Sequence, residues 1–241
     1  MSDQALVEVL ESEPMFGLNS YKSALEIRDF AKKHKLNKTQ ADLRGAVKIA
    51  VIDDEKFQPL ANLKSYGYDI TLLDDISKIS EVEGFDIVLS DLMGVGAHFD
   101  KAIGGASVIK EIKANYPTKI VIAYTGARAN SGQAIAAKDH CDHFLKKDAD
   151  LTEWSEMLDA FVQQVIDPYT MWLNARDGLL DLELDLRDVL KLEDAYVRSV
   201  LSQDRDFKSI HQVLSKADIS GNARGIVQGL IASAIYGLIF A

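Results

Sequence analysis

The sequence has almost no cysteine. Cys141 is the only cysteine in 241 residues, so no disulfide can form within the chain. Because disulfides persist mainly in oxidising compartments, this composition favours a reducing one, and we expect a cytoplasmic protein. The first fourteen residues are acidic and lack both a basic start and a long apolar core, so we do not expect a secretory signal there.

Positive charge is also scarce. The formal net charge is −10, and the longest basic run is KKHK at 32–35, which we interpret as a solvated helix end. Binding to the phosphates of a nucleic acid needs a basic surface. The sequence therefore predicts no nucleic acid partner. Acids outnumber Lys and Arg in residues 167–241 as well, so this region is not expected to bind DNA.

A long apolar run is missing too. The last thirteen residues, from Gly229, are all apolar or small, but a membrane-spanning helix needs about 20 such residues. Small residues recur every four positions in this stretch, at Gly225, Gly229, Ser233, Gly237 and Ala241. This spacing permits close helix–helix approach. We therefore predict a buried packing helix or dimer helix here, and no membrane anchor.

What the chain does contain is an alternation of strand-like and helix-like segments. Short, largely apolar, β-branched runs occupy 46–54, 68–75, 85–91, 119–126 and 142–148. Their nearly continuous apolar character is typical of strands buried on both faces of a parallel sheet. Helical patterns occupy 56–67, 105–117, 131–140 and 151–166. The alternation predicts an α/β fold with a doubly wound, five-stranded parallel sheet.

Helical patterns flank this α/β part on both sides. We divide the chain into a helical N-terminal arm at 1–45, an α/β domain at 46–166 and an all-helical output or dimerisation region at 167–241. Ser220 is expected to cap a last helix that runs to Ala241.

Polar side chains collect where the predicted strands end. Asp53 and Asp54 end the first strand, Asp91 the third and Thr125 the fourth, and Lys147 follows the fifth. In an open parallel sheet, ligands bind at this edge. Close carboxylates repel one another and so favour a cation, and a set of oxygen ligands suits Mg²⁺. One carboxylate can then act as a nucleophile toward phosphorus, with an ammonium and a hydroxyl stabilising the transferring group.

This set of residues resembles the receiver domain of two-component response regulators, a flavodoxin-like family, over residues 48 to 164. The resemblance implies that Asp91, in LSDLM, accepts a phosphoryl group from a phosphohistidine on a partner histidine kinase or phosphotransfer protein. It implies that Asp54 and Asp91 hold Mg²⁺ together with the backbone carbonyl of Met93. Asp53, the first acid of VIDDE, would act on the ion mainly through water.

The resemblance also assigns a switch. Thr125 and Lys147 would hold the phosphoryl oxygens, and Thr125 and Phe144 would shift together after phosphorylation, which adds about −1.5 to −2 charges. The shift would change the face formed by the fourth helix, fifth strand and fifth helix of the domain. The chain would then be a phosphorelay protein that acts on a downstream protein or forms a homodimer. It would not be an enzyme beyond self-catalysed phosphotransfer and slow autodephosphorylation.

Three features depart from the family pattern. Asp148 follows Lys147 where the family has proline, and only ISKISEVEG, at 76–84, separates the second and third strands, so the second helix is expected to be short. A long glycine-rich loop at 93–105 follows Asp91. We expect this loop to act as a lid over the site or as the element that recognises a kinase.

Other functions stay open. A receiver-like interaction scaffold that is not phosphorylated is the main alternative, and an enzyme with its catalytic part in 167–241 is disfavoured because no His, Cys or Ser–base cluster occurs there. His140, Cys141 and His143 suggest a metal, but neighbouring strand-edge positions cannot all point inward, so we prefer a structural role. MGVGA, at 93–97, lacks the ending of a phosphate-binding loop.

Overall fold

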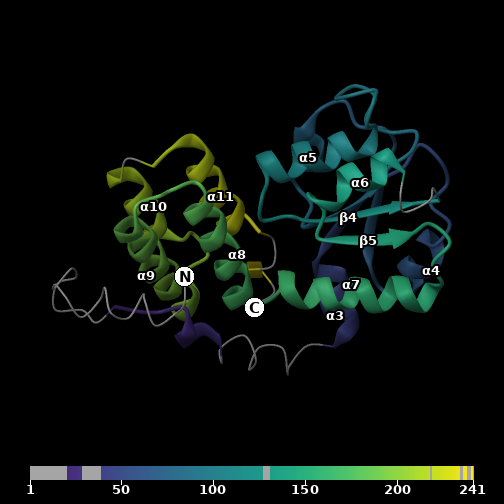
Figure 1. The fold of residues 1–241 in the computed structure, drawn as a ribbon. Coiled ribbons are helices and arrows are strands. Elements are labelled where there is room, and N and C mark those ends of the chain that lie inside the picture. The colour runs from purple at the N-terminus through teal and green to yellow at the C-terminus, as the bar shows by residue number, and fades with distance from the viewer. Residues whose placement is uncertain are drawn as a thin grey trace.

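The computed structural model describes residues 21–28, 39–126, 131–217, 219–233, 236–237 and 240. Figure 1 shows an α/β part and a helical part next to each other, connected by the long helix α7. In these ranges, no helix combines the length and the apolar character that crossing a membrane requires.

The α/β part is built on a parallel sheet with the strand order β2-β1-β3-β4-β5. The strands are β1 (Lys48–Ile52), β2 (Asp69–Leu73), β3 (Ile87–Asp91), β4 (Ile120–Thr125) and β5 (His143–Lys146). All residues of the central strands β3 and β4 are buried, whereas the edge strands β2 and β5 have exposed positions. Burial on both faces explains the continuous apolar runs in the sequence. The predicted five-stranded parallel sheet is confirmed.

Helices cover both faces of the sheet (Figure 1). Helices α3 (Gln40–Ala46), α4 (Leu60–Ser65) and α7 (Leu151–Val165) bury their apolar residues on one face, and α5 (Gly105–Asn115) and α6 (Gly132–Lys138) bury theirs on the other. A four-residue 3₁₀ turn, η1 (Ile79–Val82), stands between β2 and β3. The predicted shortening of the second helix is therefore confirmed.

The first helix of the domain is shorter than expected. It was predicted for 56–67 but begins at Leu60. Phe57 is 2 % exposed and turns into the core instead of continuing a helical face. Pro59 occupies the position before the helix, where its missing N–H is not needed.

The helical part contains α8 (Pro168–Asp181), α9 (Leu186–Leu201), α10 (Lys208–Lys216) and α11 (Gly221–Ile231). Aromatic side chains fill its centre. The Tyr196 ring stacks 5.5 Å from Trp172 and 6.1 Å from Phe207, and Tyr236 lies 4.6 Å from Phe207. This core is continuous with the face of the sheet that carries α7.

The last helix begins as predicted but ends early. Ser220 caps α11, because its Oγ accepts a hydrogen bond from the backbone N–H of Ala223 at 3.3 Å. The expected continuation to Ala241 is wrong, since α11 ends at Ile231. The chain then brings Tyr236 and Phe240 against Phe207. Ala241 itself lies outside the described residues.

Gly225 and Gly229 of α11 make no close helix contact within the part of the chain that the structure describes. Gly225 and Gly229 are exposed, and a Cβ atom added to Gly225 would meet nothing within 4 Å. The buried side of α11 carries Ala223, Ile226, Val227 and Leu230. A close contact between α8 and α11 occurs instead at Gly178, where an added Cβ would lie 3.1 Å from Ile226 Cδ1. A dimer through the small-residue side stays a prediction.

The described pieces of the N-terminal arm contact both parts of the molecule. The backbone N–H of Ala24 donates to Glu193 in α9 at 2.7 Å. In α3, the Arg44 guanidinium pairs with Asp159 of α7 at 2.7 Å. Residues 1–20 and 29–38 of the predicted arm lie outside the described residues.

Candidate functional site

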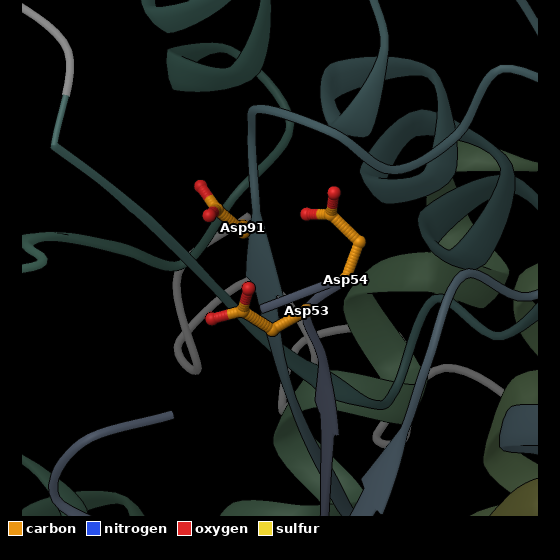
Figure 2. A group of neighbouring side chains, drawn as sticks. All are labelled: Asp53, Asp54 and Asp91. Carbon is orange, nitrogen blue, oxygen red and sulfur yellow. The ribbon is translucent and has the colours of Figure 1, made fainter. Parts of the chain in front are cut away.

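Three carboxylates converge at the carboxyl edge of the sheet (Figure 2). Asp53 and Asp54 follow β1, and Asp91 is the last residue of β3, which is paired with β1. One oxygen of each lies within 4.8 Å of the others, and Asp53 and Asp91 are buried whereas Asp54 is exposed. Three carboxylates this close favour a bound cation.

No second group of this kind occurs among the residues that the structure describes. Asp53, Asp54 and Asp91 are the one group of three or more neighbouring His, Cys, Asp or Glu side chains in the described part of the chain, and His140, Cys141 and His143 do not form such a group. The structural role preferred for DHCDH stays a prediction.

Lys147 lies at the centre of the acids. Its Nζ donates to Asp91 Oδ2 at 2.7 Å and to Asp53 Oδ1 at 3.2 Å, and it lies 3.4 Å from Glu55 Oε2. The lysine follows β5 and Asp91 ends β3, so residues 56 positions apart in the sequence meet because of the sheet. One ammonium faces several carboxylates, so the site keeps an excess of negative charge.

The ionisation of Asp91 reflects burial and this ion pair. Burial raises the pKa of Asp91, and the hydrogen bonds from Lys147 and from the Met93 N–H offset this only in part. Burial alone would lower the pKa of Lys147, but its contacts with Asp91 and Asp53 raise the pKa overall. The lysine therefore stays charged, and a further cation beside Asp91 would favour the ionised carboxylate.

Asp54 has its oxygens available. It has no hydrogen bond or ion pair within the described chain. The backbone of Gly94 lies directly against it, because a Cβ atom added to Gly94 would be only 2.0 Å from Asp54 Oδ1. Gly94 also has a φ of +77°, which side-chain-bearing residues rarely adopt. Glycine at this position thus leaves room for the Asp54 carboxylate.

The loop that contains Gly94 is fixed to the domain. Val95 is 2 % exposed and belongs to the core on the α5 side of the sheet. The N–H of Gly96 donates to Asp75 Oδ1 at 2.7 Å, and Ser107 Oγ donates to the Gly104 carbonyl at 2.6 Å. The loop therefore contacts the edge of the site through its own backbone. Its expected role as a lid or kinase-recognition element stays a prediction.

The remaining predicted residues lie at the same edge or next to it. Thr125 ends β4, is 1 % exposed and accepts a hydrogen bond through its carbonyl from the Lys147 N–H at 3.0 Å. Met93 donates its N–H to Asp91 Oδ1 at 3.2 Å. Phe144 in β5 is half-buried on the α5 and α6 side of the sheet, in register with Ala123. The roles assigned to these residues stay predictions.

Tyr124 belongs to the site but was not among the residues predicted from the sequence. Its hydroxyl donates to Asp53 Oδ2 at 2.8 Å, and the side chain is completely buried. Burial raises its pKa, and the charge of Asp53 raises it further, so the phenol stays protonated. The signal was a polar aromatic residue directly before Thr125 in an otherwise aliphatic strand.

The donor set fits a hard divalent cation such as Mg²⁺. All the candidate ligands are oxygen atoms, which Mg²⁺ prefers, and the ion usually takes only one or two protein carboxylates. An ionised carboxylate offers about four lone-pair sites. Asp54 has none of these in use, and Asp91 has two accepted hydrogen bonds. These two acids are therefore better placed than Asp53 to bind an ion directly.

The strand order β2-β1-β3-β4-β5 is the order of flavodoxin-like domains, whose ligands bind outside the carboxyl ends of the strands. The acids and Lys147 lie at that edge. The α/β part of this chain therefore has a flavodoxin-like fold. The acids after β1, the aspartate that ends β3 and the lysine after β5 lie in one cluster.

Comparisons with known proteins returned structures only. No family model and no curated protein matches the chain. A CheY-like receiver domain from Methanospirillum hungatei is similar, with 14 % identity, a TM-score of 0.40 and coverage of 49 % of this chain and 95 % of that one. A beryllofluoride-activated NtrC4 receiver domain dimer has 22 % identity, a TM-score of 0.38 and coverage of 49 % and 98 %.

A longer match is a response regulator from Burkholderia pseudomallei, whose structure holds a phosphorylated aspartic acid, a calcium ion and citrate. It has 17 % identity and a TM-score of 0.39, with coverage of 72 % of this chain and 99 % of that one.

Proposed function

We propose that the receiver domain accepts a phosphoryl group on Asp91 from a phosphohistidine of a partner histidine kinase or phosphotransfer protein. The observation that carries the proposal is the position of the Lys147 ammonium, 2.7 Å from Asp91 Oδ2 inside a cluster of acids. A structural ion pair needs one carboxylate, whereas phosphoryl transfer needs a nucleophile, a cation and a charge acceptor together. The proposal places the protein in the cytoplasm, with the kinase.

The transfer is a substitution at phosphorus. A carboxylate oxygen of Asp91 forms the new P–O bond while the bond from phosphorus to the histidine nitrogen breaks, and that nitrogen keeps the electron pair. Bound Mg²⁺ would neutralise charge on the acids and on the phosphoryl oxygens. Lys147 holds the carboxylate before transfer and can hold a phosphoryl oxygen afterwards. The Thr125 hydroxyl is the second group that we assign to a phosphoryl oxygen.

We assign the cation to Asp54, Asp91 and the Met93 carbonyl, with Asp53 acting mainly through water. The hydrogen bonds of the acids support this division, because Asp53 already accepts from Glu55, Lys147 and Tyr124. Asp54 accepts from no group in the described part of the chain.

We assign the output to protein contact. Phosphorylation would shift Thr125 and Phe144 and alter the face formed by α6, β5 and α7. Only Ile166 and Asp167 separate α7 from α8, so a change on this face reaches the helical part over a short connection. That part would bind a downstream protein or a second copy of this chain.

Intact mass measurement tests the proposal. We expect the chain to gain one phosphoryl group when incubated with Mg²⁺ and acetyl phosphate or phosphoramidate, and to lose this gain in Asp91→Asn. Asp139→Asn, which changes an exposed carboxyl in α6's C-terminal turn, is the matched control and keeps the gain. No gain in the parent chain, or a gain that Asp91→Asn leaves intact, refutes phosphorylation at Asp91 and favours the phosphorylation-independent scaffold.

Self-association is tested separately. Light scattering with and without beryllofluoride and Mg²⁺ measures the mass of the particle in solution. A doubling that requires both additions and is absent in Asp91→Asn supports a dimer under control of the site. A mass that does not change contradicts such a dimer and leaves contact with another protein as the proposed output.

A further inference from the structure

Tyr124 is the feature of this site that the proposed function does not use. Its hydroxyl donates to Asp53 Oδ2 at 2.8 Å, and no part of the side chain is exposed. The other Asp53 oxygen accepts from the Glu55 N–H at 2.9 Å and from Lys147 Nζ at 3.2 Å. Three of about four lone-pair sites on the carboxylate are thus occupied.

These three donors fix the direction of Asp53. Glu55 follows Asp53 along the chain, and the 24 % exposed Lys147 side chain reaches the acids from the surface. Tyr124 is the donor that comes from the interior. It lies on β4, two strands away from β1 in the sheet. Its contact therefore sets how far the carboxylate can rotate toward the core.

The Tyr124 ring is itself held by packing. Its centroid lies 5.6 Å from Phe57 and 5.6 Å from Trp154, and the last two rings lie 5.2 Å apart at 88°. Trp154 belongs to α7 and is fully buried. A hydroxyl on a ring in such a cluster has little freedom, so the acid that it contacts is held by the core of the domain.

We propose that Tyr124 is a positioning residue that holds Asp53 for the divalent cation and links the cation site, through Trp154, to α7. Tyr124 and Phe144 lie on opposite faces of the sheet. Phe144 packs in the core under α5 and α6, whereas Tyr124 packs in the core under α7. The site is thereby connected to both faces of the sheet. This inference rests on the cation part of the proposed function and is independent of phosphoryl transfer.

If Tyr124 positions Asp53, loss of its hydroxyl should change the preference of the site for Mg²⁺ over Ca²⁺. Mg²⁺ demands near-ideal octahedral geometry at 2.0–2.1 Å, whereas Ca²⁺ accepts flexible geometry with six to eight oxygens. An Asp53 that rotates freely still supplies charge, but it no longer supplies a fixed direction for a ligand or for a metal-bound water. Loss of the hydroxyl should therefore weaken Mg²⁺ binding more than Ca²⁺ binding.

The test compares Tyr124→Phe with Tyr68→Phe. Both substitutions delete only a hydroxyl, and the Tyr68 hydroxyl also donates to an aspartate, Asp159 Oδ1, at 2.6 Å, away from the site. Calorimetric titration with MgCl₂ and CaCl₂ at fixed ionic strength gives the affinities. We expect Tyr124→Phe to weaken Mg²⁺ binding about tenfold, as removal of outer-shell partners does, and Ca²⁺ binding by a smaller factor. Tyr68→Phe should leave both affinities unchanged.

Tryptophan emission provides the second measurement. Because the Trp154 ring packs on Tyr124, cation binding in the parent chain should change the emission, and this change should shrink in Tyr124→Phe at saturating Mg²⁺. Equal Mg²⁺ affinity, an unchanged ratio of Mg²⁺ to Ca²⁺ affinity, or an undiminished emission change in Tyr124→Phe overturns the inference while the cation site stands. A parent chain that binds neither ion overturns the cation site and the inference with it.

Discussion

Gly94 offers the sharpest test of the cation site. In Gly94→Ala, the new Cβ would lie 2.0 Å from Asp54 Oδ1 and 2.3 Å from its Cγ, whereas ordinary contact begins near 3.4 Å. The carboxylate or the loop must therefore move by about 1.4 Å, the difference between these distances. Metal–ligand distances tolerate only about 0.2 Å. We expect the Mg²⁺ dissociation constant to rise by at least about tenfold.

Backbone strain at Gly94 has to be separated from this collision. Gly94 has a φ of +77°, and Ala in that region costs about 1–2 kcal/mol by itself. Gly67→Ala is the matched control, because Gly67 has a φ of +94° and an added Cβ would meet its nearest neighbours at 3.7 Å. Gly84→Ala adds a methyl group with no neighbour within 4 Å.

Calorimetric titration with MgCl₂ measures the Mg²⁺ affinity of each variant, and thermal unfolding measures its melting temperature in parallel. Gly67→Ala should lower the melting temperature and leave the Mg²⁺ affinity unchanged, and Gly84→Ala should change neither. Gly94→Ala should lose affinity beyond its loss of stability. If Gly94→Ala binds Mg²⁺ as tightly as the parent chain does, Asp54 is not a direct ligand and the assignment of the cation site is wrong.

Three further predictions follow from single contacts. Lys147→Met should slow phosphorylation by acetyl phosphate about 100-fold, as loss of a charge-stabilising donor does, and an unchanged rate by mass measurement would contradict the assigned role. Asp159→Asn should lower the free energy of unfolding by about 1–3 kcal/mol, since Arg44 and Tyr68 lose a charged acceptor; Asp69→Asn, at an exposed strand end, is the control, and equal denaturation midpoints would contradict the estimate. Burial raises the pKa of Asp86, although the Lys48 N–H and the charge of Lys119 act in the opposite direction. The contribution of Asp86 to stability is therefore complete below the pKa of the unfolded chain and is lost as pH rises through the pKa of the folded chain. As pH falls from 7 to about 4, the melting temperature of the parent chain should therefore increase relative to that of Asp86→Asn. A difference in melting temperature that does not depend on pH would argue against a raised pKa.

The sheet could be predicted because burial on two faces leaves a simple pattern. The apolar runs of β3 and β4 have no exposed position. Acids follow β1 directly, and Asp91 is the last residue of β3. Parallel strands bring their carboxyl ends to one edge, so Asp91 and Lys147 had to be near each other once the order was known. The distance of 2.7 Å between them is the outcome of that geometry.

The details that depend on side chains from distant elements could not be predicted. The Tyr124 contact with Asp53 requires knowing that β4 lies beyond β3 and that the ring turns toward α7. Helix α11 ends at Ile231, and Tyr236 and Phe240 after it contact Phe207. Local periodicity contains no information on either contact, because both partners are remote in the sequence.

The contacts of Glu193 determine whether the helical part can fold as a separate fragment. Its carboxylate is 5 % exposed and accepts hydrogen bonds from the Ala24 N–H and from Trp172 Nε1. A fragment that begins at α8 would lack one of these donors, and a buried acceptor left unpaired costs about 1–3 kcal/mol. Such a fragment should need a synthetic peptide of residues 21–28 added in trans. The stability of the helical part would then depend on the concentration of the added peptide.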